Sequence, residues 1–309
     1  MMSFNKTLIH FRAAYVISMI FVLQVASVKA QPVEYSAESY HPELFRIEKP
    51  DNKRFDFSGM VRWNQTLYGL ADKPWNIWLY ELTMQENEYF SVMERIPVIF
   101  DGKADFEAID WLDSCFYVAD ERASKVVKVV VKKDTVTSAV LELLWDVDVS
   151  SWGNAGIEGL AVDKNENMIY IAKERDPARL FRISIKENLV TEFLLEMDIS
   201  DEDISDMKIQ DGFLYLLNRA KYRVLKFSLD TRKHLATFDY SGVLHAQNQK
   251  FYQVARYPMA EALLIDDKEI WIGLDNNGRS FNDENSYVRQ SGLEGSNPVL
   301  IRFKRPEQF

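Results

Sequence analysis

Three glutamates recur at one position of a repeated sequence phrase and could together bind a divalent cation. Glu107, Glu158 and Glu261 occupy this position in three copies of the phrase, and Ser58 and Ser205 occupy it in two others. We call these five the marker residues; they are spaced by 49, 51, 47 and 56 residues. Carboxylate and hydroxyl oxygens are hard ligands of the kind that Ca²⁺ and Mg²⁺ take. The alternative is a structural role, in which these side chains hydrogen-bond the neighbouring repeat.

A second set of polar residues lies about fourteen residues after the markers. Its members are Asp72, Glu121, Glu174, Arg219 and Asp275, and Asp120, Lys173 and Asn218 directly precede three of them. Its mixed charges could form a solvated rim of ion pairs, or they could line a pocket for a small polar ligand. An anionic ligand such as a phosphate ester would need the basic residues or a bound cation. The predicted ligand-binding residues are Asp72, Asp120, Glu121, Arg122, Lys173, Glu174, Arg175, Asn218, Arg219 and Asp275.

Short strands must position both sets, because each repeat divides into four segments rich in aliphatic, β-branched and aromatic residues. In the third repeat the predicted strands are Ile157–Val162, Met168–Lys173, Arg179–Ile185 and Val190–Met197. A four-stranded unit that recurs about every fifty residues is typical of a β-propeller blade. Because the first strand of each blade faces the central channel, the marker residues are expected to converge there.

The two ends of the chain predict how the ring closes. The fifth repeat shows only three strands, the last at Pro298–Lys304, whereas Glu43–Pro50 is a strand candidate without a repeat of its own. An N-terminal strand that completes the fifth blade would remove a free sheet edge. We therefore predict an all-β propeller with five four-stranded blades. The alternative of six blades needs additional strands within Ser241–Pro258.

Residues 1–30 are predicted to be a cleavable secretory signal peptide, and residues 31–309 a single propeller domain. Basic residues precede an apolar run that is shorter than the roughly 20 residues of a membrane-spanning helix; an uncleaved membrane anchor is the alternative. We expect a periplasmic or extracellular monomer without stable membrane insertion. Cys115 is the lone cysteine, so no internal disulfide can form.

The charge of the chain argues against nucleic acid as a partner. The formal net charge is −10, and it becomes −13 without residues 1–30, which hold three basic residues and no acidic one. Phosphate backbones would be repelled by such a chain.

With these motifs identified, the chain resembles the SdiA-regulated family of secreted bacterial propellers and, more distantly, propellers with phytase-type esterase-like activity. The motifs that carry the resemblance are Gly156–Ala161, Ala172–Pro177, Ala119–Arg122 and Ala260–Ala262, within a match from about Phe57 to Lys304. The resemblance implies a propeller and export. Asp206 departs from the pattern, since Gly59 and Gly159 occupy the equivalent position.

The leading functional hypothesis is a secreted propeller that binds a small polar ligand or a divalent cation such as Ca²⁺ at an acidic channel mouth. One alternative is a cation-assisted esterase or phosphoesterase, in which a metal polarises the bond and activates water. Another is a scaffold for protein partners. None of the four histidines falls in the repeated phrase, so a serine–histidine–aspartate triad lacks its base and the catalytic residues stay unassigned.

Overall fold

Strands pair with their sequence neighbours to build nearly all of the fold. The computed structural model describes residues 31–49, 54–86, 88–133, 135–253 and 259–309. The predicted signal peptide, residues 1–30, lies outside these residues. Residues 32–309 form one compact unit, and the description below concerns that unit. No helix in the described ranges has both the length and the apolar character needed to cross a bilayer.

Twenty of the 21 described strands fall into five antiparallel groups of four. The first group holds β3 (Phe57–Trp63), β4 (Thr66–Ala71), β5 (Trp78–Gln85) and β6 (Tyr89–Pro97). The second holds β7 (Phe106–Leu112), β8 (Cys115–Asp120), β9 (Lys125–Lys132) and β10 (Thr135–Val140). The third holds β11 (Ile157–Asp163), β12 (Met168–Lys173), β13 (Arg179–Ser184) and β14 (Val190–Glu192). The fourth holds β15 (Ile204–Gln210), β16 (Phe213–Asn218), β17 (Arg223–Ser228) and β18 (His234–Asp239). The fifth holds β19 (Ala260–Ile265), β20 (Glu269–Leu274), β21 (Val299–Lys304) and the N-terminal β2 (Glu43–Glu48).

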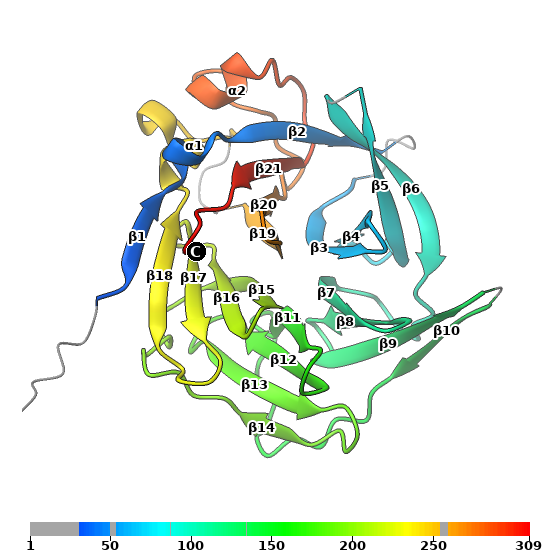
Figure 1. Cartoon of the computed structure of the whole chain (residues 1–309). Helices are drawn as coiled ribbons and strands as arrows, with labels where there is room; N and C mark the ends of the chain where they lie inside the picture. Colours follow the sequence, from blue (N-terminus) through cyan, green and yellow to red (C-terminus); the bar gives the residue numbers. More distant parts are fainter. Residues whose placement is uncertain (1–30, 50–53, 87, 134, 254–258) are drawn as a thin grey trace, which may run out of the picture. The chain divides into compact units, whose positions relative to one another are not determined.

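The first strand of each group is the innermost one, which confirms the propeller class. Within the unit, Figure 1 shows β3, β7, β11, β15 and β19 gathered around a common centre, with the later strands of each group farther out. These inner strands contact one another in sequence order, and β19 contacts β3 to complete the cycle. Hydrophobic clusters fill the spaces between adjacent groups; for example, the rings of Tyr68 and Phe116 lie 5.8 Å apart.

Strand β2 completes the fifth group, as the sequence predicts. It runs antiparallel to β21, with Glu43 opposite Arg302 and Arg46 opposite Val299. It also runs parallel to β6, so the fifth and first groups join into one eight-stranded sheet. Because the fifth and first groups are not separate sheets, the count of five blades stays a prediction. A further N-terminal strand, β1 (Val33–Ser36), pairs in parallel with β18.

Short helices occupy the segment between β1 and β2 and the connections between β18 and β19 and between β20 and β21. They are η1 (Ala37–Tyr40), α1 (Ser241–Leu244), η2 (Ala246–Asn248) and α2 (Ser286–Gln290). The six-blade alternative needs strands in the connection before β19, but the described part of that connection forms α1, η2 and an isolated bridge from Tyr252 to Phe281. Helix α2 is capped by Asn285, whose side chain accepts hydrogen bonds from the backbone N–H groups of Tyr287 and Val288.

Deleting residues 31–50 should lower the melting temperature and cause self-association. Without β2, the backbone groups of β21 and β6 become free sheet edges. Buried Phe45, which stacks on Trp271 and meets Phe90 edge to face, is also lost. Thermal melting and light scattering after size-exclusion chromatography would check both effects. A truncated protein that stays monomeric with an unchanged melting temperature would show that β2 contributes little to closure.

Candidate functional site

The five marker residues share one backbone feature that sets the direction of their side chains. In every inner strand the pairing with the second strand shifts register at the marker, for example between Ile157 and Gly159, so that Glu158 is the extra residue. The same shift surrounds Ser58, Glu107, Ser205 and Glu261. A β-bulge re-aims the side chain of its extra residue. The repeated bulge therefore gives each marker an equivalent orientation.

The second set is held by an equally regular hydrogen bond. Asp72, Glu121, Glu174, Arg219 and Asp275 are each the first residue after the second strand of a group. Each donates its backbone N–H to the carbonyl of the residue that precedes the inner strand, at 2.8–3.0 Å. These hydrogen bonds hold the end of each second strand beside the start of the inner strand, where the bulge lies. Both predicted sets converge on one region.

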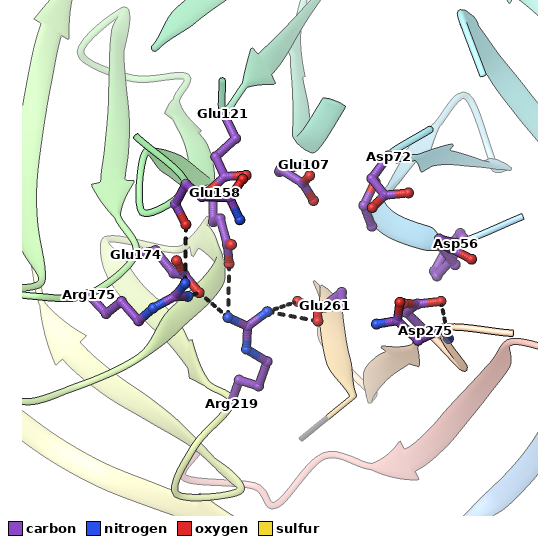
Figure 2. A pocket seen from close by; sticks show the side chains of 14 residues that line it. Asp56, Asp72, Glu107, Glu121, Glu158, Glu174, Arg175, Arg219, Glu261 and Asp275 are labelled. Atoms are coloured by element: carbon purple, nitrogen blue, oxygen red, sulfur yellow. Dashed lines mark hydrogen bonds and ion pairs between the residues drawn. The ribbon is translucent and has the colours of Figure 1, made fainter. Parts of the chain in front are cut away.

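That region contains a cavity of about 290 Å³ that described residues line. Eight carboxylates line it against two guanidinium groups, as Figure 2 shows from close by. The lining residues are Asp56, Phe57, Ser58, Asp72, Glu107, Glu121, Asn154, Glu158, Glu174, Arg175, Arg219, Glu261, Asp275 and Asn277. We call it the central cavity. Its charge makes cations the favoured occupants.

The two marker serines take the structural role that was the alternative for the whole set. Ser58 donates its hydroxyl to the carbonyl of Phe106 at 2.5 Å, and Ser205 donates to the carbonyl of Ala260 at 2.7 Å. Each bond joins an inner strand to the start of the next one. Ser205 does not line the cavity, whereas Ser58 does. The marker glutamates make no such backbone bond among the described residues, so their carboxylates are available to the cavity.

Arg219 forms the ion-paired side of the cavity. Its Nη1 donates to both carboxylate oxygens of Glu261, at 2.7 and 2.6 Å. Its Nη2 contacts Glu174, lies 3.0 Å from Asp203 Oδ1 and 3.4 Å from Glu158 Oε2. Arg175 also pairs with Glu174. Figure 2 shows the Arg219 guanidinium between the carboxylates of Glu158, Glu174 and Glu261.

The opposite side of the cavity is paired less completely. Lys73 lies 2.6 Å from Asp56 and 2.7 Å from Asp72, and Arg54 also pairs with Asp56. The side chain of Asp275 accepts a hydrogen bond from the backbone N–H of Asn277. For Glu107, the residues that the structure describes provide neither a hydrogen-bond donor nor a salt bridge to the carboxylate.

Burial and mutual repulsion raise the pKa of most carboxyl groups in the cavity. Burial raises the pKa of Glu107 well above its usual range, and the charges of Glu158, Asp72 and Glu121 raise it further. Burial likewise raises the pKa of Glu158, although nearby Arg219 opposes this shift. The pKa of Asp72 rises to about 6 through burial, with Lys73 opposing. The pKa of Glu121 also rises to about 6 through burial. Burial and neighbouring negative charge thus both disfavour the ionised form of these carboxyl groups.

Four predicted ligand-binding residues do not line the cavity and instead bond backbone groups or other side chains. Asp120 accepts hydrogen bonds from the N–H groups of Asp105 and Ala123. Lys173 donates to the carbonyls of Arg175 and Pro177, and Asn218 pairs with Glu202 and the N–H of Lys221. The side chain of Arg122 is 56% exposed and pairs with Asp105. The cavity lining therefore excludes these four residues.

Sequence reasoning missed a third repeated acidic position. Asp56, Asp105 and Asp203 each precede the inner strand of their group, and each pairs with a basic residue near the cavity. A signal was present, because all three lie two residues before a marker. Gly156 and Met259 occupy that position in the other two repeats. Asn154 and Asn277 also line the cavity, but they lie on loops outside the repeated phrase.

Two carboxylate clusters in this region are compact enough to hold a metal ion. One oxygen each from Glu121, Glu158 and Glu174 lie within 4.8 Å of one another. The same holds for a second cluster of Asp72, Asp105 and Glu107. In the first cluster, buried Oε2 atoms of Glu158 and Glu174 have no hydrogen-bond donor among the described residues. Such donor sets suit Ca²⁺, which takes six to eight oxygens at 2.3–2.6 Å in flexible geometry.

Farther along the inner strands, a buried lysine links two strands that are not neighbours in the ring. Lys208 of β15 donates its ammonium group to the carbonyl of Ile109 in β7 at 3.1 Å and to Asp206 at 3.0 Å. Asp206 accepts further bonds from the N–H groups of Met207 and Leu263. Burial raises the pKa of Asp206 to about 7, with Lys208 opposing. Asp206, the departure from the glycine pattern, is thus a structural ion-pair partner.

The fold and the repeated phrase agree with a comparison to protein families. A family model described as SdiA-regulated matches residues 59–253. This chain belongs to the SdiA-regulated family. The resemblance inferred from the repeated motifs is therefore confirmed, and the match contains three of the five markers, Glu107, Glu158 and Ser205. The more distant resemblance to phytase-type esterase-like propellers stays a prediction.

Solved structures similar to this member of the SdiA-regulated family are β-propeller-like proteins. Glutaminyl cyclase from Myxococcus xanthus matches with a TM-score of 0.54 at 10% identity, over 89% of this chain and 100% of that chain. Regucalcin, a calcium-binding protein from Agrobacterium tumefaciens str. C58, matches with a TM-score of 0.46 at 10% identity, over 90% of this chain and 98% of that chain. At this level of identity, the similarity to glutaminyl cyclase shows the fold alone.

Proposed function

We propose that this protein is an exported propeller that binds a divalent cation, with Ca²⁺ as the best fit, in the central cavity. The observation that carries the proposal is the compact cluster of Glu121, Glu158 and Glu174. Two of its buried carboxylate oxygens lack a hydrogen-bond donor in the described chain. Glu158 Oε2 has only an ion pair with Arg219 Nη2 at 3.4 Å, and a buried polar atom without a hydrogen bond costs about 1–3 kcal/mol. A bound cation would satisfy both.

The charge balance of the cavity supports a cation over an anionic ligand. Eight carboxylates face two guanidinium groups, and both of these, Arg175 and Arg219, already pair with carboxylates. The remaining basic candidates, Lys173 and Arg122, are absent from the cavity lining. A phosphate ester would therefore meet a surface of its own charge unless a cation bound first. For this reason we propose cation binding, and not esterase activity, as the primary function.

Millimolar Ca²⁺ should raise the melting temperature of the wild-type protein, and Glu158→Gln should remove most of that rise. A ligand that binds only the folded state stabilises it by RT ln(1 + [L]/Kd), about 2.7 kcal/mol at one hundred times Kd. Glutamine keeps the shape of the side chain and removes its charge. Thermal melting in chelator and in CaCl₂, MgCl₂ or MnCl₂ would measure the effect.

The matched control is Glu192→Gln, which changes a glutamate of β14 that pairs with Arg179; neither residue lines the cavity. This variant should keep the full calcium response. If Glu158 had only a structural role, Glu158→Gln would lower the melting temperature equally with and without Ca²⁺. A wild-type melting temperature that ignores all three cations and the chelator would exclude the proposal.

A further inference from the structure

Arg219 is the exception in an otherwise acidic repeat position. The other residues at this position, the first after the second strand, are Asp72, Glu121, Glu174 and Asp275. The fourth group thus places a cation where the other groups place an anion, with the same backbone hydrogen bond. The guanidinium lies inside the site, because its side chain is only 13% exposed. A positive charge tethered to the chain occupies the acidic cavity.

The contacts of Arg219 reach the carboxylates that a metal ion would need. It contacts Glu158 and Glu174 of the compact cluster, and it also binds Glu261 through two hydrogen bonds. Burial alone would lower the pKa of Arg219, but the surrounding carboxylates Glu158, Glu261 and Asp203 outweigh this effect and raise it. The group therefore keeps its charge, as arginine does in proteins.

One guanidinium cannot satisfy all of these oxygens. Its donors lie in a fixed planar fork, and here they are directed mainly at Glu261, Asp203 and one oxygen of Glu174. The Oε2 atoms of Glu158 and Glu174 accept no hydrogen bond from the described part of the chain, and Glu158 Oε2 has only its 3.4 Å ion pair with Arg219. The cluster is thus partly neutralised by Arg219 and still retains ligand atoms for a second cation.

We infer that Arg219 is a built-in competitor of the metal ion and sets the affinity of the central cavity for divalent cations. The inference rests on the proposed function, because it concerns the same cavity. In the metal-free protein, the guanidinium neutralises the carboxylates that would otherwise repel one another. When a divalent cation enters the Glu121–Glu158–Glu174 cluster, it meets the positive charge of Arg219 at close range. Binding is weakened by this repulsion and by the loss of ion pairs.

Arg219→Met should therefore increase the affinity for Ca²⁺ by at least about tenfold, measured by isothermal titration calorimetry with CaCl₂. The same variant should melt at a lower temperature than the wild type in chelator, because the buried carboxylates lose their counter-charge. In saturating CaCl₂ most of this difference should disappear. Arg219→Lys, which keeps the charge, should bind Ca²⁺ with an affinity close to that of the wild type.

The control for the loss of an arginine is Arg223→Met. Arg223 pairs with Glu202 and does not line the cavity, so its replacement should leave calcium affinity unchanged. A purely structural role for Arg219 would lower the melting temperature in chelator and in calcium alike, without tighter binding. That result, or binding that is lost in Arg219→Met, would overturn the inference.

The outcomes separate this inference from the proposed function. If the wild type binds no cation and Arg219→Met does, the proposed function fails and the competitor role stands. If the wild type binds Ca²⁺ and the variant binds no more tightly, the function stands and the inference fails. If neither protein binds Ca²⁺, Mg²⁺ or Mn²⁺ in titrations, both are excluded.

Discussion

Replacing Lys208 with methionine should destabilise the protein by about 3–5 kcal/mol at pH 8.5 and by much less at pH 5. Removing one partner of a buried ion pair leaves the other charge uncompensated. The side chains of Lys208 and Asp206 are only 7% and 0% exposed. The pKa of Asp206 is already raised to about 7 by burial, and loss of the lysine charge should raise it further.

The pH dependence follows from that raised pKa. A carboxyl whose folded-state pKa exceeds its unfolded value favours folding at low pH, and the favourable contribution is lost as pH rises through the folded pKa. At pH 5 Asp206, whose pKa is raised to about 7, is neutral in both proteins, so Lys208→Met no longer removes its ion pair with that side chain. At pH 8.5 the variant must either bury the Asp206 carboxylate without its partner or take up a proton at Asp206, and both cost free energy.

Denaturant unfolding at the two pH values would measure this difference. Lys226→Met is the matched control, because Lys226 is also buried but donates to the carbonyl of Gln308 and has no carboxylate partner among the described contacts. The loss of unfolding free energy in Lys226→Met should be similar at both pH values. An equal loss at pH 5 and pH 8.5 for Lys208→Met would show that Asp206 is not the group that the lysine stabilises.

The second large effect is that the metal-free protein should become more stable as the pH falls from 8 to 5. The pKa values of Asp72 and Glu121 are raised to about 6 by burial. Those of Glu107, Glu158 and Asp275 are raised well above their usual ranges, also chiefly by burial. Folding therefore takes up protons in this range, and stability rises on acidification. Since one pKa unit corresponds to about 1.4 kcal/mol, we expect a gain of at least about 2 kcal/mol.

Saturating Ca²⁺ should reduce or reverse this trend, because a bound cation keeps the cavity carboxylates ionised. Glu107→Gln should make the pH dependence in chelator less steep, whereas Glu192→Gln, which changes an exposed glutamate paired with Arg179, should not. Asp206 contributes equally to the pH dependence of the unfolding free energy in the wild type and in both variants. Its contribution therefore cancels when these proteins are compared. A metal-free protein that loses stability steadily between pH 8 and pH 5 would contradict the raised pKa values.

The repeated phrase was sufficient to predict the propeller class, the closing strand and the convergence of the marker glutamates. These features depend on strand periodicity and on repeat spacing, both of which are local properties of the sequence. The orientation of the markers was less accessible, because the bulge at Glu158 arises from its pairing with β12. The two marker serines have side chains short enough to bond the carbonyl of the next strand, and they do so.

Part of the second set lies outside the cavity lining for a simple geometric reason. Lys173 and Asn218 are the last residues of their strands and bond the backbone or Glu202, whereas Glu174 and Arg219 follow the strand ends and line the cavity. The missed aspartates have a different cause. Asp56, Asp105 and Asp203 share a repeat position with Gly156 and Met259, and those two residues conceal the acidic pattern.

The double pairing of β2 also determines when this fold can be completed. Its partner in the fifth group is β21, so residues 43–46 must wait for residues 299–302, near the other end of the chain. Its parallel partner β6 is far closer in sequence, with Arg46 opposite Tyr89. A chain that emerges N-terminus first could pair β2 with β6 early, but the ring closes only after the final strand has formed. Contacts of such long sequence separation slow folding. The last step of folding therefore follows the formation of β21.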